Sequence, residues 1–126
     1  MGTRSLTYVY EGRHPVVCLY RQYDGYPSGH GAELAEFLMG YDIVNGFGEK
    51  RAKLANGMGC LAAQMVAHFK TETGNFYLHA PLLDRDDGQD FEYHVYDKQV
   101  IIMDHSGDPI FKGTHAELAD YCKERA

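Results

Sequence analysis

The sequence predicts a single α+β domain over residues 1–126, with an antiparallel sheet of about five or six strands and two or three helices packed mainly on one face. Two observations support this class. The hydrophobic period changes from two to about 3.6 and back to two along the chain, and turn-type residues separate the segments. The resulting order is two strands, two helices, four strands and a final helix, which favours an antiparallel sheet.

Two β-rich runs, residues 3–10 and 16–23, open the chain, and the Gly- and Pro-containing turn between them predicts a β-hairpin. A helical repeat of apolar residues follows at about 31–39. The next region is punctuated by glycines and is compatible with a short helix over 49–55. A more regular apolar stripe predicts a helix over 60–70.

The second half of the chain returns to a period of two and closes with a helix. Thr114 and Glu117 have the spacing of a capping box, which places the start of this last helix at Thr114. Leu118, Tyr121 and Cys122 then form its predicted buried stripe. The four predicted strands before it are 75–79, 91–96, 100–104 and 110–112.

Charge and cysteine content exclude several classes of partner. The net charge is −6, and residues 64–126 supply all of it, because residues 1–63 hold six basic and six acidic side chains. An acidic chain lacks the phosphate-neutralising surface that DNA binding needs. The three cysteines lack metal-ligand spacing, so we expect reduced thiols, no metal and no cofactor. No apolar segment approaches a membrane span, so we expect a cytoplasmic protein without membrane contact.

One segment, residues 20–31, concentrates the side chains expected to bind a ligand. It leaves a strand, passes an Asp-Gly turn and enters a helix, where unpaired N–H groups and bare glycine backbone favour an anion. Arginines nearby could supply a forked donor, and tyrosines could stack on a base. The predicted ligand-binding residues are Arg4, Arg21, Tyr23, Asp24, Tyr26, Ser28, Gly29 and His30.

The same segment also has a purely structural interpretation. Asp24 with Gly25 has the composition of a plain turn, and Ser28 suits a helix N-cap. Gly29 and Gly31 suit positions where a helix packs closely against a sheet. The segment has neither the Lys-Ser/Thr ending of a P-loop nor a G-x-G-x-x-G pattern. The sequence leaves both interpretations open.

The chain also carries a family resemblance. Gly-Thr-Arg-Ser at 2–5, Asp-Gly-Tyr-Pro at 24–27 and the loop Asp-Arg-Asp-Asp-Gly at 84–88 resemble a family of small uncharacterised proteins of phages and prophage-bearing bacteria. Gln22 stands where the family commonly has His, and Asp87 where it has a second Arg. The resemblance implies a phage setting in the bacterial host's cytoplasm. Small non-enzymatic domains in such settings often blunt host defence by sequestering a signal or blocking a protein.

Two further segments carry polar clusters. The acidic run 84–90 fails the EF-hand spacing, so we expect a solvated acidic hairpin loop rather than a calcium site. None of the seven histidines forms an HxH, HxxxH or HExxH motif. Asp104, with Asp108, could orient His105 for base catalysis. No nucleophile, base and orienting group can be assembled from spacing alone.

Three functions are compatible with these observations. The first is binding of a small anionic ligand, such as a nucleotide-type signal in phage counter-defence. The second is an inhibitor that covers a host protein through the acidic second half. The third is a small hydrolase that uses Asp24, His30 or the pair Asp104 and His105. The resemblance places the first two ahead of an enzyme. A chain this small is also compatible with a homo-oligomer that forms its pocket at a subunit interface.

Overall fold

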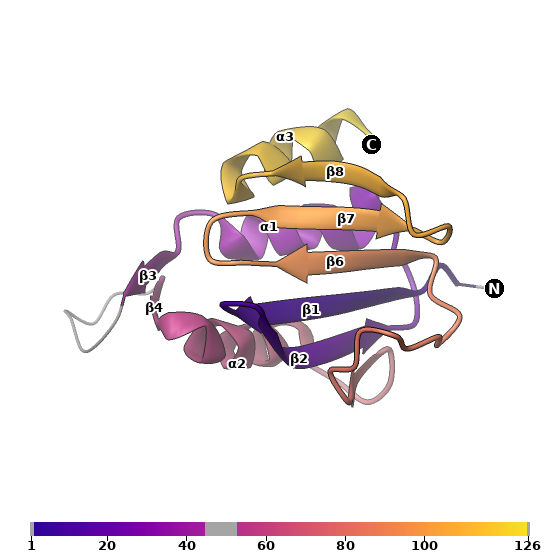
Figure 1. Cartoon of the computed structure of the whole chain (residues 1–126), viewed down its shortest axis with the longest axis horizontal. Coiled ribbons are helices and arrows are strands. Elements are labelled where there is room, and N and C mark those ends of the chain that lie inside the picture. Colours follow the sequence, from indigo (N-terminus) through magenta and orange to yellow (C-terminus); the bar gives the residue numbers. More distant parts are fainter. Residues whose placement is uncertain (1, 45–52, 126) are drawn as a thin grey trace.

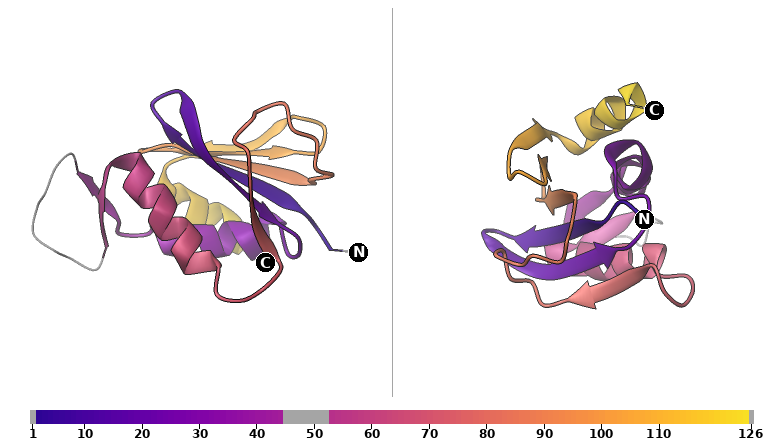
Figure 2. Two further views of the ribbon diagram at one scale, coloured as in Figure 1. Left: turned by 90° about the horizontal axis from the view of Figure 1, so that it is seen from below. Right: turned by 90° about the vertical axis from the view of Figure 1, so that its right-hand side faces the viewer.

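The computed structural model describes residues 2–44 and 53–125. In this part of the chain a six-stranded sheet carries a layer of helices on one face, as Figure 2 shows from below. The α+β class is therefore confirmed. The main sheet contains β1 (Ser5–Glu11), β2 (His14–Arg21), β5 (Phe76–His79), β6 (Phe91–Val95), β7 (Val100–Asp104) and β8 (Pro109–Gly113). The remaining elements are η1 (Pro27–Gly31), α1 (Ala32–Leu38), β3 (Asp42–Val44), β4 (Leu54–Asn56), α2 (Gly57–Phe69) and α3 (His115–Glu124).

The sheet has the strand order β5-β2-β1-β6-β7-β8 (Figure 1). Its pairings are antiparallel except for β1 with β6, which run parallel. The sheet is mostly antiparallel, as predicted, and this parallel pair is the exception within the six strands. It arises because the chain leaves the β1–β2 hairpin, forms α1, α2 and the edge strand β5, and then returns to the other side of β1. The short strands β3 and β4 pair separately.

The core lies between the sheet and the helices. Leu34 of α1, Leu61 of α2 and Leu118 of α3 are at most 1% exposed, and they pack against strand residues such as Val9 and Ile102. α2 contacts β1 and β2, whereas α1 and α3 contact each other. No helix in residues 2–44 and 53–125 has the length and apolar character needed to cross a bilayer.

Most predicted elements appear within a few residues of their expected bounds. The capping box of α3 is confirmed, because the Glu117 amide donates to Thr114 Oγ1 and the Thr114 amide donates to Glu117 Oε1. Ser28 is not an N-cap: the π-helical turn η1 begins at Pro27, and no side chain caps η1 or α1. Of the predicted helix 49–55, residues 54 and 55 belong to β4 and the part up to residue 52 lies outside the described residues.

Residues 80–90, which we call the strap, do not form the predicted hairpin loop. β2 and β1 lie between β5 and β6 in the sheet, so the strap crosses the face opposite the helices, which we call the open face (Figure 1). The Tyr8 hydroxyl donates to the Leu82 carbonyl at 2.8 Å, and Asp87 Oδ2 lies 2.9 Å from His79 Nδ1. The strap is therefore fastened over the β5–β2–β1 part of the open face.

Candidate functional site

The predicted binding segment divides between the two faces of the sheet. Arg21 lies opposite Ser5 in the β1–β2 register and points toward the helices, where it is 6% exposed. Its Nε donates to the Tyr23 carbonyl at 2.6 Å, and Nη1 donates to His30 Nδ1 at 3.2 Å and to Glu33. The guanidinium also lies 4.9 Å from the centre of the Phe76 ring. The buried Arg21 guanidinium is thus paired with a carboxylate of Glu33 that is half exposed.

His30 is completely buried beside Arg21. A guanidinium has only donors, so His30 Nδ1 accepts, and Nε2–H donates to Thr7 Oγ1 at 2.7 Å. Burial, and secondarily the positive charge of Arg21, lower the pKa of His30 to about 3. His30 is therefore a neutral internal link between β1, β2 and η1, and solvent does not reach it for acid–base chemistry.

The amides of Gly29 and His30 at the glycine-containing helix start are not free to bind an anion. The Gly29 amide donates to the Tyr26 carbonyl at 2.9 Å, and the His30 amide donates to the Asp24 carbonyl at 2.8 Å. A Cβ at Gly29 would lie 2.6 Å from the Asp24 oxygen, and one at Gly31 would lie 2.8 Å from Cys122 Sγ. These close approaches agree with the structural interpretation, in which the two glycines allow the helix start to pack tightly against its neighbours.

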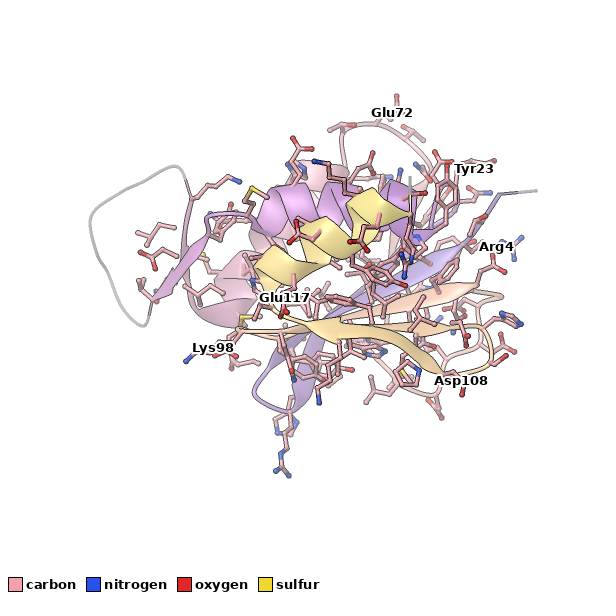
Figure 3. All side chains as sticks on the ribbon, turned by 90° about the horizontal axis from the view of Figure 1, so that it is seen from above. Arg4, Tyr23, Glu72, Lys98, Asp108 and Glu117 are labelled. Atoms are coloured by element: carbon pink, nitrogen blue, oxygen red, sulfur yellow. The ribbon has the colours of Figure 1, made fainter. Side chains whose placement is uncertain are left out.

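Arg4 and Tyr23 do not complete a site around Arg21. Alternation along β1 directs Arg4 away from the helices, and its Nη1 lies 2.7 Å from the position of a Cβ on Gly88 in the strap. Tyr23 is 50% exposed at the same end of the molecule, as Figure 3 shows. The eight predicted residues therefore supply one buried Arg21–His30 pair and several separate surface positions.

Three aspartates of the strap make hydrogen bonds or ion pairs within the protein. Asp86 Oδ1 accepts from the Gly88 amide at 3.1 Å, Asp90 Oδ2 from the Arg4 amide at 3.0 Å, and Asp87 pairs with Arg85 at 2.8 Å. The Arg85 guanidinium is the largest influence that lowers the pKa of Asp87. Within the described residues no group of histidine, cysteine and carboxylate side chains has metal-binding geometry.

The proposed Asp104–His105 pair is not assembled either. Asp104 Oδ1 accepts from the backbone amides of Ser106 at 2.9 Å and Asp108 at 3.1 Å. This carboxylate therefore stabilises the β7–β8 turn, and His105 is exposed beside it. The structure does not bring these residues together as an acid–base pair.

A polar and aromatic row instead crosses the open face of the sheet. The strand registers place the row's members opposite one another in successive strands, from His79 through Cys18, Tyr8, His94 and Ile101 to Lys112. The strap covers the first part of this row, and the part over β6–β8 borders a cavity of about 390 Å³, the open-face pocket. The open-face pocket is lined by Tyr10, His94, Tyr96, Ile101, Met103, Pro109 and Lys112.

Beneath the open-face pocket lies a hydrogen-bonded series that sequence spacing did not reveal. The Tyr10 hydroxyl is 2.7 Å from His94 Nδ1, and His94 Nε2 is 3.0 Å from Glu92 Oε1. Gln89 of the strap donates to Glu92 Oε2 at 2.9 Å. The hydrogen bond from His94 is the main cause that lowers the pKa of Glu92, which keeps this carboxylate ionised. Burial raises the pKa of Tyr10.

Stacked rings hold this floor in place. The Tyr8 and His94 rings lie 5.2 Å apart at 5°, and the Tyr10 and Tyr96 rings lie 4.4 Å apart at 11°. Both pairs join β1 to the end of β6. Tyr10 is 4% exposed and Tyr96 is only partly buried, so Tyr96 presents more aromatic surface to a ligand.

Lys112 supplies positive charge at the rim of the open-face pocket. It is exposed, and its ammonium group makes no hydrogen bond or ion pair with the side chains or backbone of residues 2–44 and 53–125. Lys112 also borders a second hollow of about 500 Å³ at the junction of β8 and α3, together with Lys98. Glu117 borders this second hollow too, but its carboxylate caps α3.

A hollow of about 610 Å³ beside α1 and α2 is less suited to a ligand. Lys53 lines this hollow, but its ammonium group already donates to the carbonyls of Glu36 at 3.2 Å and Met39 at 2.7 Å. The hollow beside Arg21, about 360 Å³, has Glu33 and Glu36 at its edge, so it disfavours an anion. Compared with these two hollows, only the open-face pocket has both stacked rings and an ammonium group that has no partner among the described residues.

The sequence contains a partial signal for this site. Tyr8 and Tyr10 alternate in one strand, and Glu92 and His94 alternate in another, and residues two apart in a strand share a face of the sheet. Their meeting depends on the parallel pairing of β1 with β6, which joins residues more than 80 positions apart. The chain matches no family model, no curated protein and no solved structure, so comparison with known proteins does not assign it to a family.

Proposed function

We propose that this protein binds a small, planar, anionic ligand in the open-face pocket. The single observation that carries the proposal is the position of Lys112, an ammonium group unpaired within the described residues, beside a cavity with a floor of stacked aromatic rings. Ligand sites typically are concave, mostly apolar cavities with a few placed polar groups, and 390 Å³ lies in their usual size range.

The expected ligand contacts follow from the lining. A flat ring can stack against Tyr96, and Ile101 and Met103 supply apolar contact along β7. The anionic group then lies beside Lys112. Because the chain carries a net charge of −6, its overall field repels anions, so a specific cation must supply the attraction. A nucleotide-type molecule has both required features.

The biological setting is part of the proposal and rests on the phage resemblance in the sequence. A ligand-binding protein of a phage, located in the cytoplasm of its bacterial host, could act by sequestering a nucleotide-type signal of the host's defence. Sequestration requires binding without turnover. The raised pKa of Tyr10 supports this, because a buried, protonated phenol is a poor nucleophile despite its contact with His94.

Binding of a panel of nucleotides and aromatic carboxylates, measured by native mass spectrometry and equilibrium dialysis, tests the proposal. We expect at least one of these anions to bind, and Lys112→Ala to weaken its binding by roughly 10- to 100-fold, as expected for loss of a charge-assisted contact. Lys123→Ala on the exposed surface of α3 is the matched control and leaves binding unchanged. Equal affinity of the two variants, or no binding of any anion, overturns the proposal.

A further inference from the structure

We propose that two copies of this chain pair through the outer edges of their β5 strands, antiparallel and about a two-fold axis at Leu78, to form one continuous sheet. This inference is independent of the proposed function. β5 and β8 are the two outer strands of the main sheet, and β5 forms the lower edge in the right-hand view of Figure 2. The open-face pocket lies toward the β8 end of the sheet, so pairing at β5 leaves it accessible.

The two edges of the sheet differ in the features that prevent pairing. β8 begins with Pro109 and carries the exposed Lys112, and its pairing with β7 contains a register shift. A proline, a lysine and a β-bulge are features with which proteins keep an edge strand from pairing with another chain. β5 has none of the three, because its sequence is Phe-Tyr-Leu-His and its register with β2 is continuous. The β5 edge is therefore unprotected.

The backbone of Leu78 is available for such pairing. The Gln22 amide donates to the Asn75 carbonyl at 2.8 Å, and opposed residues of an antiparallel pair alternate between exchanging hydrogen bonds and pointing outward. Phe76 and Leu78 therefore direct their amide and carbonyl groups away from β2. Those of Phe76 are satisfied within the chain. Those of Leu78 have no partner among the described residues, so they can bond to a strand of another chain.

The side chains along this edge are apolar and uncharged. Residues 73–83 hold no aspartate, glutamate, lysine or arginine. Four of the eight large hydrophobic side chains that are exposed in the described residues lie in this segment, and Leu78 is the most exposed of them, at 61%. Beside Leu78 lies an apolar groove of about 330 Å³, which Leu19 of β2 and Val66 of α2 also line. Burial of this surface favours association.

A second copy is the partner that these features favour. The chain carries a net charge of −6, so two copies repel each other on the whole, but not along the uncharged segment 73–83. Two-fold pairing places Leu78 opposite the second copy's Leu78, and the two residues exchange both of their hydrogen bonds. The apolar grooves of the two copies then meet at Leu78. The edge is thus self-complementary, as a two-fold interface requires.

Sedimentation velocity of the ligand-free protein tests the proposal. β5 has four residues, so we expect a small interface and a weak, micromolar dimer, visible between about 1 µM and about 0.5 mM protein. Leu78→Lys puts a charge into the apolar contact, and we expect it to weaken the dimer by about tenfold or more. Met39→Lys, which makes the same change at an exposed residue at the end of α1, keeps the dimer. A monomer at every concentration, or equal dimer affinities of the two variants, overturns the proposal.

Cysteine cross-linking tests the two-fold register itself, in a Cys60→Ser background that removes the partly exposed native thiol. The Cα atoms of the paired Leu78 residues are expected about 5.5 Å apart, within reach of a disulfide. The two Tyr77 residues are displaced from the axis in opposite directions and lie more than about 7 Å apart. Mild oxidation should therefore link Leu78→Cys, but not Tyr77→Cys, into dimers. Equal linking of the two variants, or no link at Leu78 where the unmodified protein is dimeric, overturns this pairing.

Discussion

The hydroxyl oxygen of Tyr10 lies 2.7 Å from Nδ1 of His94, and both residues are less than 10% exposed. The two residues belong to the central parallel strand pair, β1 and β6, which joins the N-terminal hairpin to the C-terminal half of the sheet. The other imidazole nitrogen, Nε2, is hydrogen-bonded to Glu92 Oε1 at 3.0 Å. The same contact therefore links the two halves of the fold beneath the open-face pocket.

Replacing Tyr10 with Phe tests this contact as a source of stability. The ring and its stacking on Tyr96 remain, so the loss comes from His94 Nδ1, which is left without its hydrogen-bond partner. We expect the free energy of unfolding to fall by about 1–3 kcal/mol in urea titrations. The matched variant Tyr20→Phe removes a hydroxyl that the described residues do not bind, and it should change stability by less than about 0.5 kcal/mol. Equal effects of the two variants would contradict the prediction.

Arg21→Ala separates the structural interpretation of segment 20–31 from the ligand-binding one. Arg21 is 6% exposed and links Tyr23, His30 and Glu33, so its removal breaks a buried network. We expect a loss of roughly 3 kcal/mol in stability, near the lower end for broken buried ion pairs because Glu33 itself reaches solvent.

Thermal unfolding by circular dichroism measures this loss, and Arg13→Ala in the exposed β1–β2 turn is the control. An unchanged melting temperature in Arg21→Ala would show that Arg21 is kept for a ligand, as the sequence alone suggested. A large decrease confirms the structural role.

Local patterns in the sequence predicted the elements better than their assembly. The capping box at Thr114 and the apolar stripe of α2 are interactions between near neighbours, so spacing alone reveals them. The strap was missed because a hairpin is the shortest connection between two strands. Nothing in residues 80–90 shows that β2 and β1 lie between the strands they join.

The candidate site was predicted least well, for a related reason. Segment 20–31 has the composition of an anion site, but its amides and its arginine are satisfied by the carbonyls of Asp24 and Tyr26 and by Glu33, which spacing cannot show. Conversely, Tyr10 and His94 are ordinary strand residues in the sequence. Only the register of a long-range parallel pair places them in contact.

Gly31→Ala tests the close packing of the helix start against α3. A Cβ at this position would lie 2.8 Å from Cys122 Sγ and 3.4 Å from the Tyr93 ring, so the buried neighbours must move. We expect a loss of about 1–3 kcal/mol, as for overpacking in a core. Gly59→Ala in α2 is the control, because the nearest atom to its Cβ is 3.9 Å away.

A double-mutant cycle identifies the contact responsible. Cys122→Ala removes the sulfur, so Gly31→Ala should cost less stability in that background than in the unmodified protein. Additive effects in urea unfolding would show that the strain lies elsewhere, at Tyr93.

The pH dependence of stability follows from His30, whose folded pKa of about 3 lies below the unfolded value of about 6.5. Between these two values the unfolded chain binds a proton that the folded protein excludes. His30 therefore makes its full contribution to the free energy of unfolding above about pH 6.5. This contribution decreases by up to about 1.4 kcal/mol per pH unit as the pH falls toward 3. The carboxylates of Asp87 and Glu92, whose folded pKa values are also lowered, add to the loss only at the acidic end of this window.

Urea unfolding from pH 5 to 7 isolates the contribution of His30. We expect His30→Gln to be less stable at neutral pH but to show a flatter dependence on pH, whereas His14→Gln, in the exposed hairpin, keeps the slope. A direct measurement is the NMR titration of the His30 imidazole, whose resonances should not shift between pH 8 and 5. A midpoint near neutral pH would mean that the imidazole is reached by solvent, and it would contradict the buried, neutral link between Arg21 and Thr7.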